Sequence, residues 1–171
     1  MKTGVEKLTD VMAHFLGHTA IRLPDDVIAK LEELRDKEDH PLAKVIYRTM
    51  FRNQMLAEEL HRPSCQDTGV PQYWVRCGTA FPYINELEDL LREATIQATF
   101  ETPLRHNSVQ TFDEYNTGKN VGKGTPTVWW DIIPHSDQCE IYTYLSGGGC
   151  SLPGCATVLM PGEGYEGIVK F

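Results

Sequence analysis

The stretch QYWVRCG, residues 72–78, decides the fold, because polar and apolar side chains alternate along it in the period-two pattern of a β-strand. Two later stretches, TVWWDII at 127–133 and CEIYTYL at 139–145, also read as strands. The turn PHSDQ at 134–138 joins them, which predicts an antiparallel hairpin. We therefore expect a small, mostly antiparallel sheet.

Two glycine-rich loops flank this predicted hairpin. NTGKNVGKGTP at 116–126 precedes it, and SGGGCSLPG at 146–154 follows it. Both contain too much glycine to form the interior of a helix or strand. Because the strands of an antiparallel pair run in opposite directions, the two loops should lie at the same end of the sheet.

Residues 1–61 predict three helices. Thr3 and Glu6 have capping-box spacing at the start of the first, and Pro24 and Pro41 mark the starts of the other two.

The third helix should end before Pro63, since the residue that precedes a proline avoids the helical region. Its apolar stripe is so broad that we expect neighbours to cover it on more than one side. The stripe consists of Leu42, Val45, Ile46, Met50, Phe51, Met55, Leu56 and Leu60.

A fourth helix is expected within 83–98. A helix-like segment after Pro161 runs to the end of the chain without a polar residue that would end it, and we interpret this ending as a truncation and not a natural C-terminus. The whole pattern predicts an α+β fold, in which a helical N-terminal layer packs on the small sheet with its glycine-rich loops. We expect a single domain, 1–171, with a helical part at about 1–62 and an α+β part at about 63–171.

The chain has 171 residues, of which 41% are apolar, and this is enough for one packed domain. Its formal charge of −8 argues against nucleic acid or an anionic membrane surface as a partner, because both bind clustered Lys and Arg. No apolar run approaches the ~18 residues of a membrane span, and the N-terminus lacks a signal-peptide core, so we expect a cytoplasmic protein.

Five cysteines, an odd number, predict free thiols rather than a disulfide framework.

The stretch RPSCQDTG, 62–69, places Cys65 on a polar turn. One interpretation is a partly buried thiol beside a turn. The other is a metal ligand with a substrate alongside, because Gln66 and Asp67 put hydrogen-bonding groups next to a potential thiolate and Gly69 permits a left-handed backbone. The residue pattern leaves both open.

Two loop features are weaker candidates. Cys150 and Cys155 have a spacing that occurs in iron–sulfur motifs, but no third cysteine lies close in the sequence. The loop with Lys119 and Lys123 could present backbone N–H groups and positive charge to a carboxylate or phosphate, or it could be a solvated loop.

Arg105 and His106 follow the predicted fourth helix, where an arginine can hold a carboxylate through two hydrogen bonds or simply be exposed. The remaining histidines show no metal-binding spacing, and we interpret them as structural. They are His14, His18, His40, His61 and His135.

Several blocks, in this order along the whole chain, closely resemble the iron–sulfur family of tartrate dehydratases and class I fumarate hydratases. The blocks are RPSCQDTG, PLRHNSV, NTGKNVGKGTP, WWDIIP, SGGGCSLPG and LMPGEGYEGIVKF. The resemblance implies a lyase that removes water from a hydroxy-dicarboxylate, with L-tartrate to oxaloacetate first and fumarate/malate as the alternative. It also implies a 4Fe–4S cluster held by three cysteines, with one iron open to the substrate.

Carried over position by position, the resemblance assigns Cys65 as a cluster ligand. It assigns Gln66, Asp67 and Arg105 to substrate binding, with Asp67 also the catalytic candidate. Gly149 matches a substrate-binding position where a side chain would intrude.

The same resemblance puts the other two cluster cysteines downstream of YEGIVKF, and it assigns no cluster role to Cys150 or Cys155. We therefore expect the front portion of an alpha subunit, which alone binds no cluster and is inactive. A beta subunit, or a C-terminal domain of the same enzyme, would complete the site, and we expect an oligomer.

Two other hypotheses remain. The chain could be a truncated, non-catalytic protein that binds only a partner subunit or a dicarboxylate. It could also be a small anion-binding module that uses the loop with Lys119 and Lys123.

Overall fold

Strand β1 (Val70–Gly78) lies at the centre of a three-stranded sheet, between β4 (Thr127–Ile133) and β5 (Cys139–Ser146). It pairs in parallel with β4 and antiparallel with β5. A separate antiparallel ribbon joins β2 (Val109–Gln110) to β3 (Tyr115–Asn116). This computed structural model describes residues 2–110, 115–148 and 156–171. The α+β class is confirmed, whereas the main sheet is mixed rather than mostly antiparallel.

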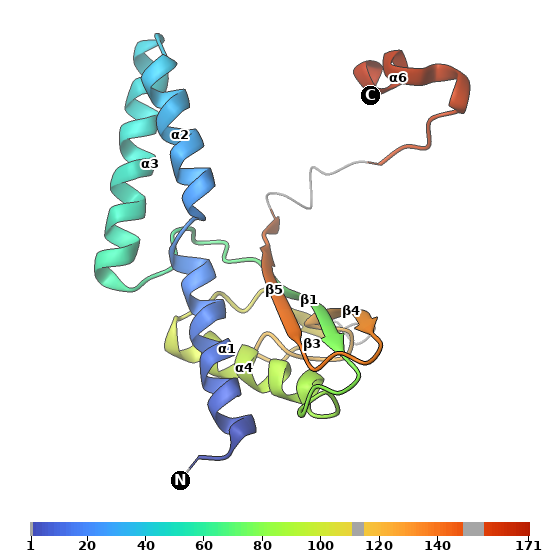
Figure 1. Ribbon diagram of the computed structural model, residues 1–171. Helices are drawn as coiled ribbons and strands as arrows, with labels where there is room; N and C mark the ends of the chain where they lie inside the picture. The colour runs from blue at the N-terminus through green and yellow to red at the C-terminus, as the bar shows by residue number, and fades with distance from the viewer. Residues whose placement is uncertain (1, 111–114, 149–155) are drawn as a thin grey trace.

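Six helical segments lie wholly within the described parts of the chain (Figure 1). They are α1 (Gly4–Ile21), α2 (Asp25–Lys37), α3 (Pro41–Leu60), α4 (Leu87–Glu101), the 3-10 turn η1 (Pro161–Glu163) and α6 (Gly164–Lys170).

The predicted hairpin is wrong, because β1 lies between its two strands and pairs with both. Helix α4 explains the parallel pairing, since a chain that returns parallel to a strand needs a long crossover and α4 lies on the way from β1 to β4. β4 and β5 still run in opposite directions. The start of β4, where the loop 116–126 arrives, therefore lies at the same end of the sheet as the end of β5.

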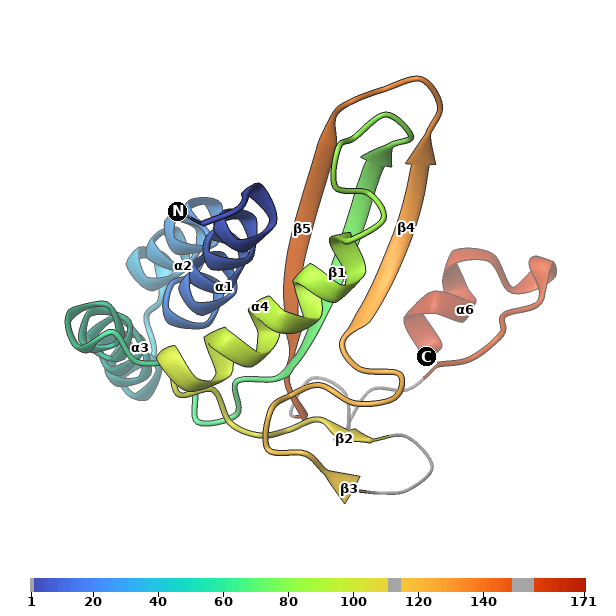
Figure 2. The same ribbon diagram turned by 90° about the horizontal axis from the view of Figure 1, so that it is seen from below.

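The core lies between one face of β1, helix α4 and helix α1 (Figure 2). Every second residue of β1 points into this core, as the alternation predicts. The side chains of β1 in this core are Tyr73, Val75 and Cys77; they meet Leu87, Leu90, Leu91, Ala94 and Ala98 of α4 and Met12, Ala13, Leu16 and Ala20 of α1.

Helix α1 begins with the predicted capping box. The Glu6 N–H donates to Thr3 Oγ1 at 3.2 Å, and the Thr3 N–H donates to Glu6 Oε2 at 2.7 Å. The helix continues through Gly17, where a Cβ would lie 2.3 Å from Thr102 Oγ1. The glycine therefore lets α1 approach the end of α4 closely.

Helices α2 and α3 form an arm that stands away from the sheet (Figure 1). α2, which is described in full, buries no residue, and in α3, also described in full, only Ala57 is buried. The expectation that neighbours cover α3 is therefore wrong, and of the predicted N-terminal helical layer α1 is the helix that joins the core. The exposed apolar residues of α3 are Leu42, Val45, Ile46, Met50, Met55 and Leu60.

Among the described residues, no helix is both long enough and apolar enough to cross a membrane.

Tyr73 should make the fold sensitive to alkaline pH. Burial raises the pKa of Tyr73 from 10.0 to about 12, while its hydroxyl shares a 2.9 Å hydrogen bond with Thr95 Oγ1. Above pH 10 the unfolded chain releases this proton and the folded chain retains it, so stability is complete below pH 10 and declines towards about pH 12. We expect the free energy of unfolding to fall by up to about 1.4 kcal/mol per pH unit from this group.

Urea unfolding followed by fluorescence, below pH 10 and between pH 10 and about 12, measures this effect. Tyr73→Phe should flatten the slope, whereas Tyr144→Phe, at an exposed position, should retain it. An unchanged slope in Tyr73→Phe would contradict the assignment.

Candidate functional site

The turn 62–69 links the end of α3 to the start of β1 and is tied to both neighbouring helices. Helix α3 ends where His61 takes a left-handed backbone (φ 50°), just before Pro63, as predicted. The Ser64 N–H donates to the Ala20 carbonyl at 3.0 Å, and Asn53 Nδ2 donates to the Ser64 carbonyl at 2.6 Å. These contacts hold the following residue, Cys65, at the surface as an exposed free thiol.

The Asp67 carboxylate connects this turn to two distant segments. Asn107 Nδ2 donates to Asp67 Oδ1 at 2.7 Å, and the Gly148 N–H donates to Asp67 Oδ2 at 2.7 Å. We call this pair of hydrogen bonds the Asp67 clasp. It joins the turn, the segment 105–108 and the start of the second glycine-rich loop at one end of the sheet.

Arg105 lies beside the same turn. Its Nη1 donates to Gln66 Oε1 at 3.3 Å, and its backbone N–H donates to Thr68 Oγ1 at 3.0 Å. Gln66 and Arg105 are exposed, whereas Asp67 and Asn107 are half-buried. An exposed guanidinium held against an amide can accept a carboxylate from solvent through its remaining N–H groups.

Gly69 makes the approach of the turn to β5 possible. Its φ is +85°, the left-handed conformation that the sequence allowed for. A Cβ at this position would lie 2.8–2.9 Å from backbone atoms of Leu145, Ser146 and Gly147. Any side chain here would push the turn away from the end of β5.

The structure thus brings together four of the five candidate residues, Cys65, Gln66, Asp67 and Arg105. The fifth, Gly149, lies outside the described residues, as do Cys150 and Cys155. The two glycines just before it, however, lie against Asp67: the Gly148 N–H binds the carboxylate, and a Cβ at Gly147 would be 3.6 Å from Asp67 Oδ2.

Sequence reasoning missed Asn107. It lies two residues after Arg105 in the block PLRHNSV, so its membership of that block was the available signal. Its side chain supplies one of the two donors to Asp67.

The loop 116–126 is folded on itself. Thr117 Oγ1 donates to the Val121 carbonyl at 2.6 Å, and the guanidinium of Arg92 donates to the carbonyls of Gly122 and Thr125 at 2.9 and 3.2 Å. Lys119 and Lys123 are exposed. Anion binding by these two lysines stays a prediction.

Within the described residues, no three His, Cys, Asp or Glu side chains gather as a metal-binding group. Cys65 offers one exposed sulfur. Cys77 and Cys139 face each other across β1 and β5, and burial together with the Cys77 thiol raises the pKa of Cys139 to about 12. All three are free thiols, as the sequence predicts; Cys77 belongs to the core, and the partly buried Cys139 packs against it.

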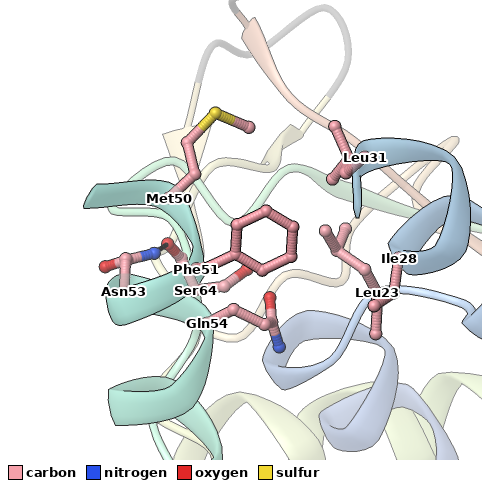
Figure 3. Close-up of a pocket in the computed structure, with 8 residues that line it drawn as sticks. All are labelled: Leu23, Ile28, Leu31, Met50, Phe51, Asn53, Gln54 and Ser64. Atoms are coloured by element: carbon pink, nitrogen blue, oxygen red, sulfur yellow. Dashed lines mark hydrogen bonds between the residues drawn. The ribbon is translucent and has the colours of Figure 1, made fainter. Parts of the chain in front are cut away.

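An apolar pocket of about 200 Å³ lies between α2 and α3 and reaches Ser64 of the turn, but none of the candidate residues lines it (Figure 3). Phe51 and Met50 of α3 face Ile28 and Leu31 of α2 across it. Its lining offers no charged group, so the chemistry of the site belongs to the end of the sheet.

A family model described as fumarate hydratase (fumerase) matches residues 9–171. The chain is 53% identical to the L(+)-tartrate dehydratase subunit alpha of Escherichia coli (strain K12), over 98% of this chain and 55% of that protein. It is 33% identical to the putative L(+)-tartrate dehydratase subunit alpha of Methanocaldococcus jannaschii, over 96% of this chain and 59% of that protein. The chain thus spans little more than half the length of these curated relatives.

The three described cysteines should differ sharply in reactivity. Cys65 is exposed, Cys77 is buried, and the thiolate of Cys139 is about a thousandfold rarer near neutral pH than that of a cysteine with the ordinary pKa of 9.0. Alkylation with iodoacetamide, followed by peptide mass spectrometry, should therefore modify Cys65 long before the other two. Denatured protein, in which all three should react, is the control, and modification of Cys139 as fast as Cys65 in the folded protein would contradict this order.

Proposed function

Because the chain belongs to the fumarate hydratase (fumerase) family, we propose that it is part of a hydro-lyase that removes water from a hydroxy-dicarboxylate. The observation that carries the proposal is the Asp67 clasp, which draws the turn bearing Cys65 and Gln66 towards the segment bearing Arg105. A thiol, an amide, a carboxylate and a guanidinium thus meet at one end of the sheet. These groups are suited to a dicarboxylate bound beside a metal centre, because guanidinium pairs with carboxylate and thiolate binds iron–sulfur clusters.

Dehydration of such a substrate requires binding of its carboxylates, polarisation of the departing hydroxyl, and removal of a proton from the adjacent carbon. We assign binding of a substrate carboxylate to Arg105, which is exposed and oriented by Gln66 and Thr68. Gln66 supplies a further hydrogen-bonding group next to it. Asp67 is the catalytic candidate, and its two oxygens also hold the segments around the substrate.

The proposed cofactor is a 4Fe–4S cluster, with Cys65 as one of its ligands. The exposed residue Cys65, on the turn that carries Gln66, fits this role, while Cys77 lies in the core and Cys139 packs against it. The other two cysteine ligands would come from outside these residues. When bound, the cluster would supply Lewis acidity towards the departing hydroxyl.

L-Tartrate is the first substrate proposed, because the relatives at 53% identity are named for it. Loss of one water from tartrate gives the enol of oxaloacetate, which becomes the ketone when one proton moves to carbon. Malate and fumarate are the second pair to test, since the family model is named for fumarate hydratase.

The proposal includes a beta subunit or a further domain as partner, and an oligomeric enzyme in the cytoplasm, where thiols remain reduced. The word alpha in the names of the relatives supports a second kind of subunit. Exposed apolar side chains on the arm and on the outer face of the sheet, among them Trp74 and Trp129, offer surface for such contacts.

Cys65→Ser in the full-length subunit, assembled with its partner under anaerobic conditions, should lower turnover of L-tartrate by about 100-fold or more, because a lost ligand costs at least as much as a lost supporting contact. Cys155→Ser, at a cysteine without an assigned role, should retain near wild-type activity. The dehydration assay is read together with the visible absorption of the cluster. Equal losses in both variants would show that the ligand assignment is wrong.

Reconstitution with iron and sulfide separates this proposal from a non-catalytic binding role. The 171-residue chain alone should gain no stable cluster, whereas the assembled full-length enzyme should gain both the cluster and activity. An assembled enzyme that binds tartrate and malate without turning over either would favour the binding role.

A further inference from the structure

Asn120 is a polar residue in the core that the proposed chemistry does not use. It lies in the loop 116–126, its side chain is completely buried, and its φ is +56°. Asparagine tolerates this left-handed conformation better than most residues. A buried amide is costly unless its hydrogen-bonding groups find partners, so its contacts must explain its position.

The Asn120 amide makes four hydrogen bonds. Its Oδ1 accepts from the N–H groups of Asn107 and Ser108 at 3.0 and 3.2 Å. Its Nδ2 donates to the Arg105 carbonyl and to Thr99 Oγ1, both at 3.1 Å. Two donors and two acceptor lone pairs are the full capacity of a side-chain amide, so Asn120 is saturated.

Three of these four bonds go to the backbone of the segment 105–108. The fourth goes to Thr99, which is buried on α4 and donates to the Thr95 carbonyl at 2.7 Å. Asn120 therefore fixes the segment against the core helix. Arg105 and Asn107 are carried on the fixed backbone, and Asn107 in turn binds Asp67.

We propose that Asn120 is a positioning residue of the active site, which sets the places of Arg105 and Asn107 through their backbone groups. This inference rests on the proposed function for its effect on turnover. The side chain of Asn120 is completely buried, so a substrate cannot reach it. Asn120 therefore acts through the segment 105–108.

No other residue type supplies this set of contacts in the same space. Aspartate has the same shape and accepts from Asn107 and Ser108, but it would place an acceptor against the Arg105 carbonyl. Alanine would remove the acceptor of the Ser108 N–H, and it would leave the Asn107 N–H and the Arg105 carbonyl bonded only to each other. The two substitutions therefore disturb different parts of one contact set.

The test is a double-mutant cycle in the full-length enzyme assembled with its partner. Asn120→Asp should lower kcat/KM for the dicarboxylate about 10–100-fold, chiefly through a higher KM, as lost supporting contacts do. In an Arg105→Ala background the same change should cost at least about threefold less, because the carboxylate contact of Arg105 is already lost and only the effect through Asn107 and Asp67 remains. Full additivity of the two losses would overturn the proposal.

Two matched variants separate positioning from general damage. Asn85→Asp makes the same chemical change at an exposed site in the turn before α4 and should leave kcat/KM unchanged. Val75→Ala opens a cavity in the core of the sheet and should lower the melting temperature without raising KM. A KM increase in Val75→Ala as large as in Asn120→Asp would reduce Asn120 to a stabilising role.

A second readout is independent of turnover. Amide hydrogen exchange of the segment 105–108 in the assembled enzyme should be at least about tenfold faster in Asn120→Ala than in Val75→Ala, because the Ser108 N–H loses its acceptor and the Asn107 N–H loses one of two. If Asn120→Ala fails to fold, Thr99→Val, which removes one acceptor of the amide, should give the same effects in smaller degree. Unchanged exchange in a folded variant would overturn the proposal, whereas wild-type enzyme without turnover would overturn the proposed function alone.

Discussion

The burial of β1 between two other strands is the constraint on which the rest of the structure depends. Both edges of β1 are paired, and Tyr73, Val75 and Cys77 fill the space under α4. With β1 fixed, the turn that enters it and the loops that adjoin β4 and β5 all come to one end of the sheet. That geometry lets one carboxylate, Asp67, reach two segments that lie 40 and 81 residues away along the chain.

Local patterns predicted the elements, but they could not predict how the elements pair. The strands at 127–133 and 139–145 exist as expected, because alternation and turn residues act over a few neighbours. Their separation by β1 depends on burial across the whole fold, and a short turn between two strands is compatible with either outcome. The same limit applies to α3. The spacing of its apolar residues is the same whether other elements cover them or leave them exposed.

The family resemblance of the sequence blocks is confirmed, and the blocks located four candidate residues that the structure brings together. Asn107 and Asn120 escaped detection for a physical reason. Asparagine is common in turns, where it is usually exposed, so its presence between two predicted elements signals a turn and not a buried contact. In the loop 116–126 the charged residues Lys119 and Lys123 are exposed, whereas the uncharged Asn120 is completely buried.

The described parts of the site separate the groups that hold it from the groups that can meet a ligand. The holding contacts end largely on backbone atoms: Asp67 accepts from the Gly148 N–H, and three of the four bonds of Asn120 go to the backbone of 105–108. Because these contacts use its backbone groups, Arg105 keeps most of its guanidinium available. Arg105 can therefore be fixed at its base and exposed at its tip, next to the exposed Gln66 and Cys65. In the proposed hydro-lyase, such a division lets a rigid core orient flexible charged side chains without placing those side chains in the core.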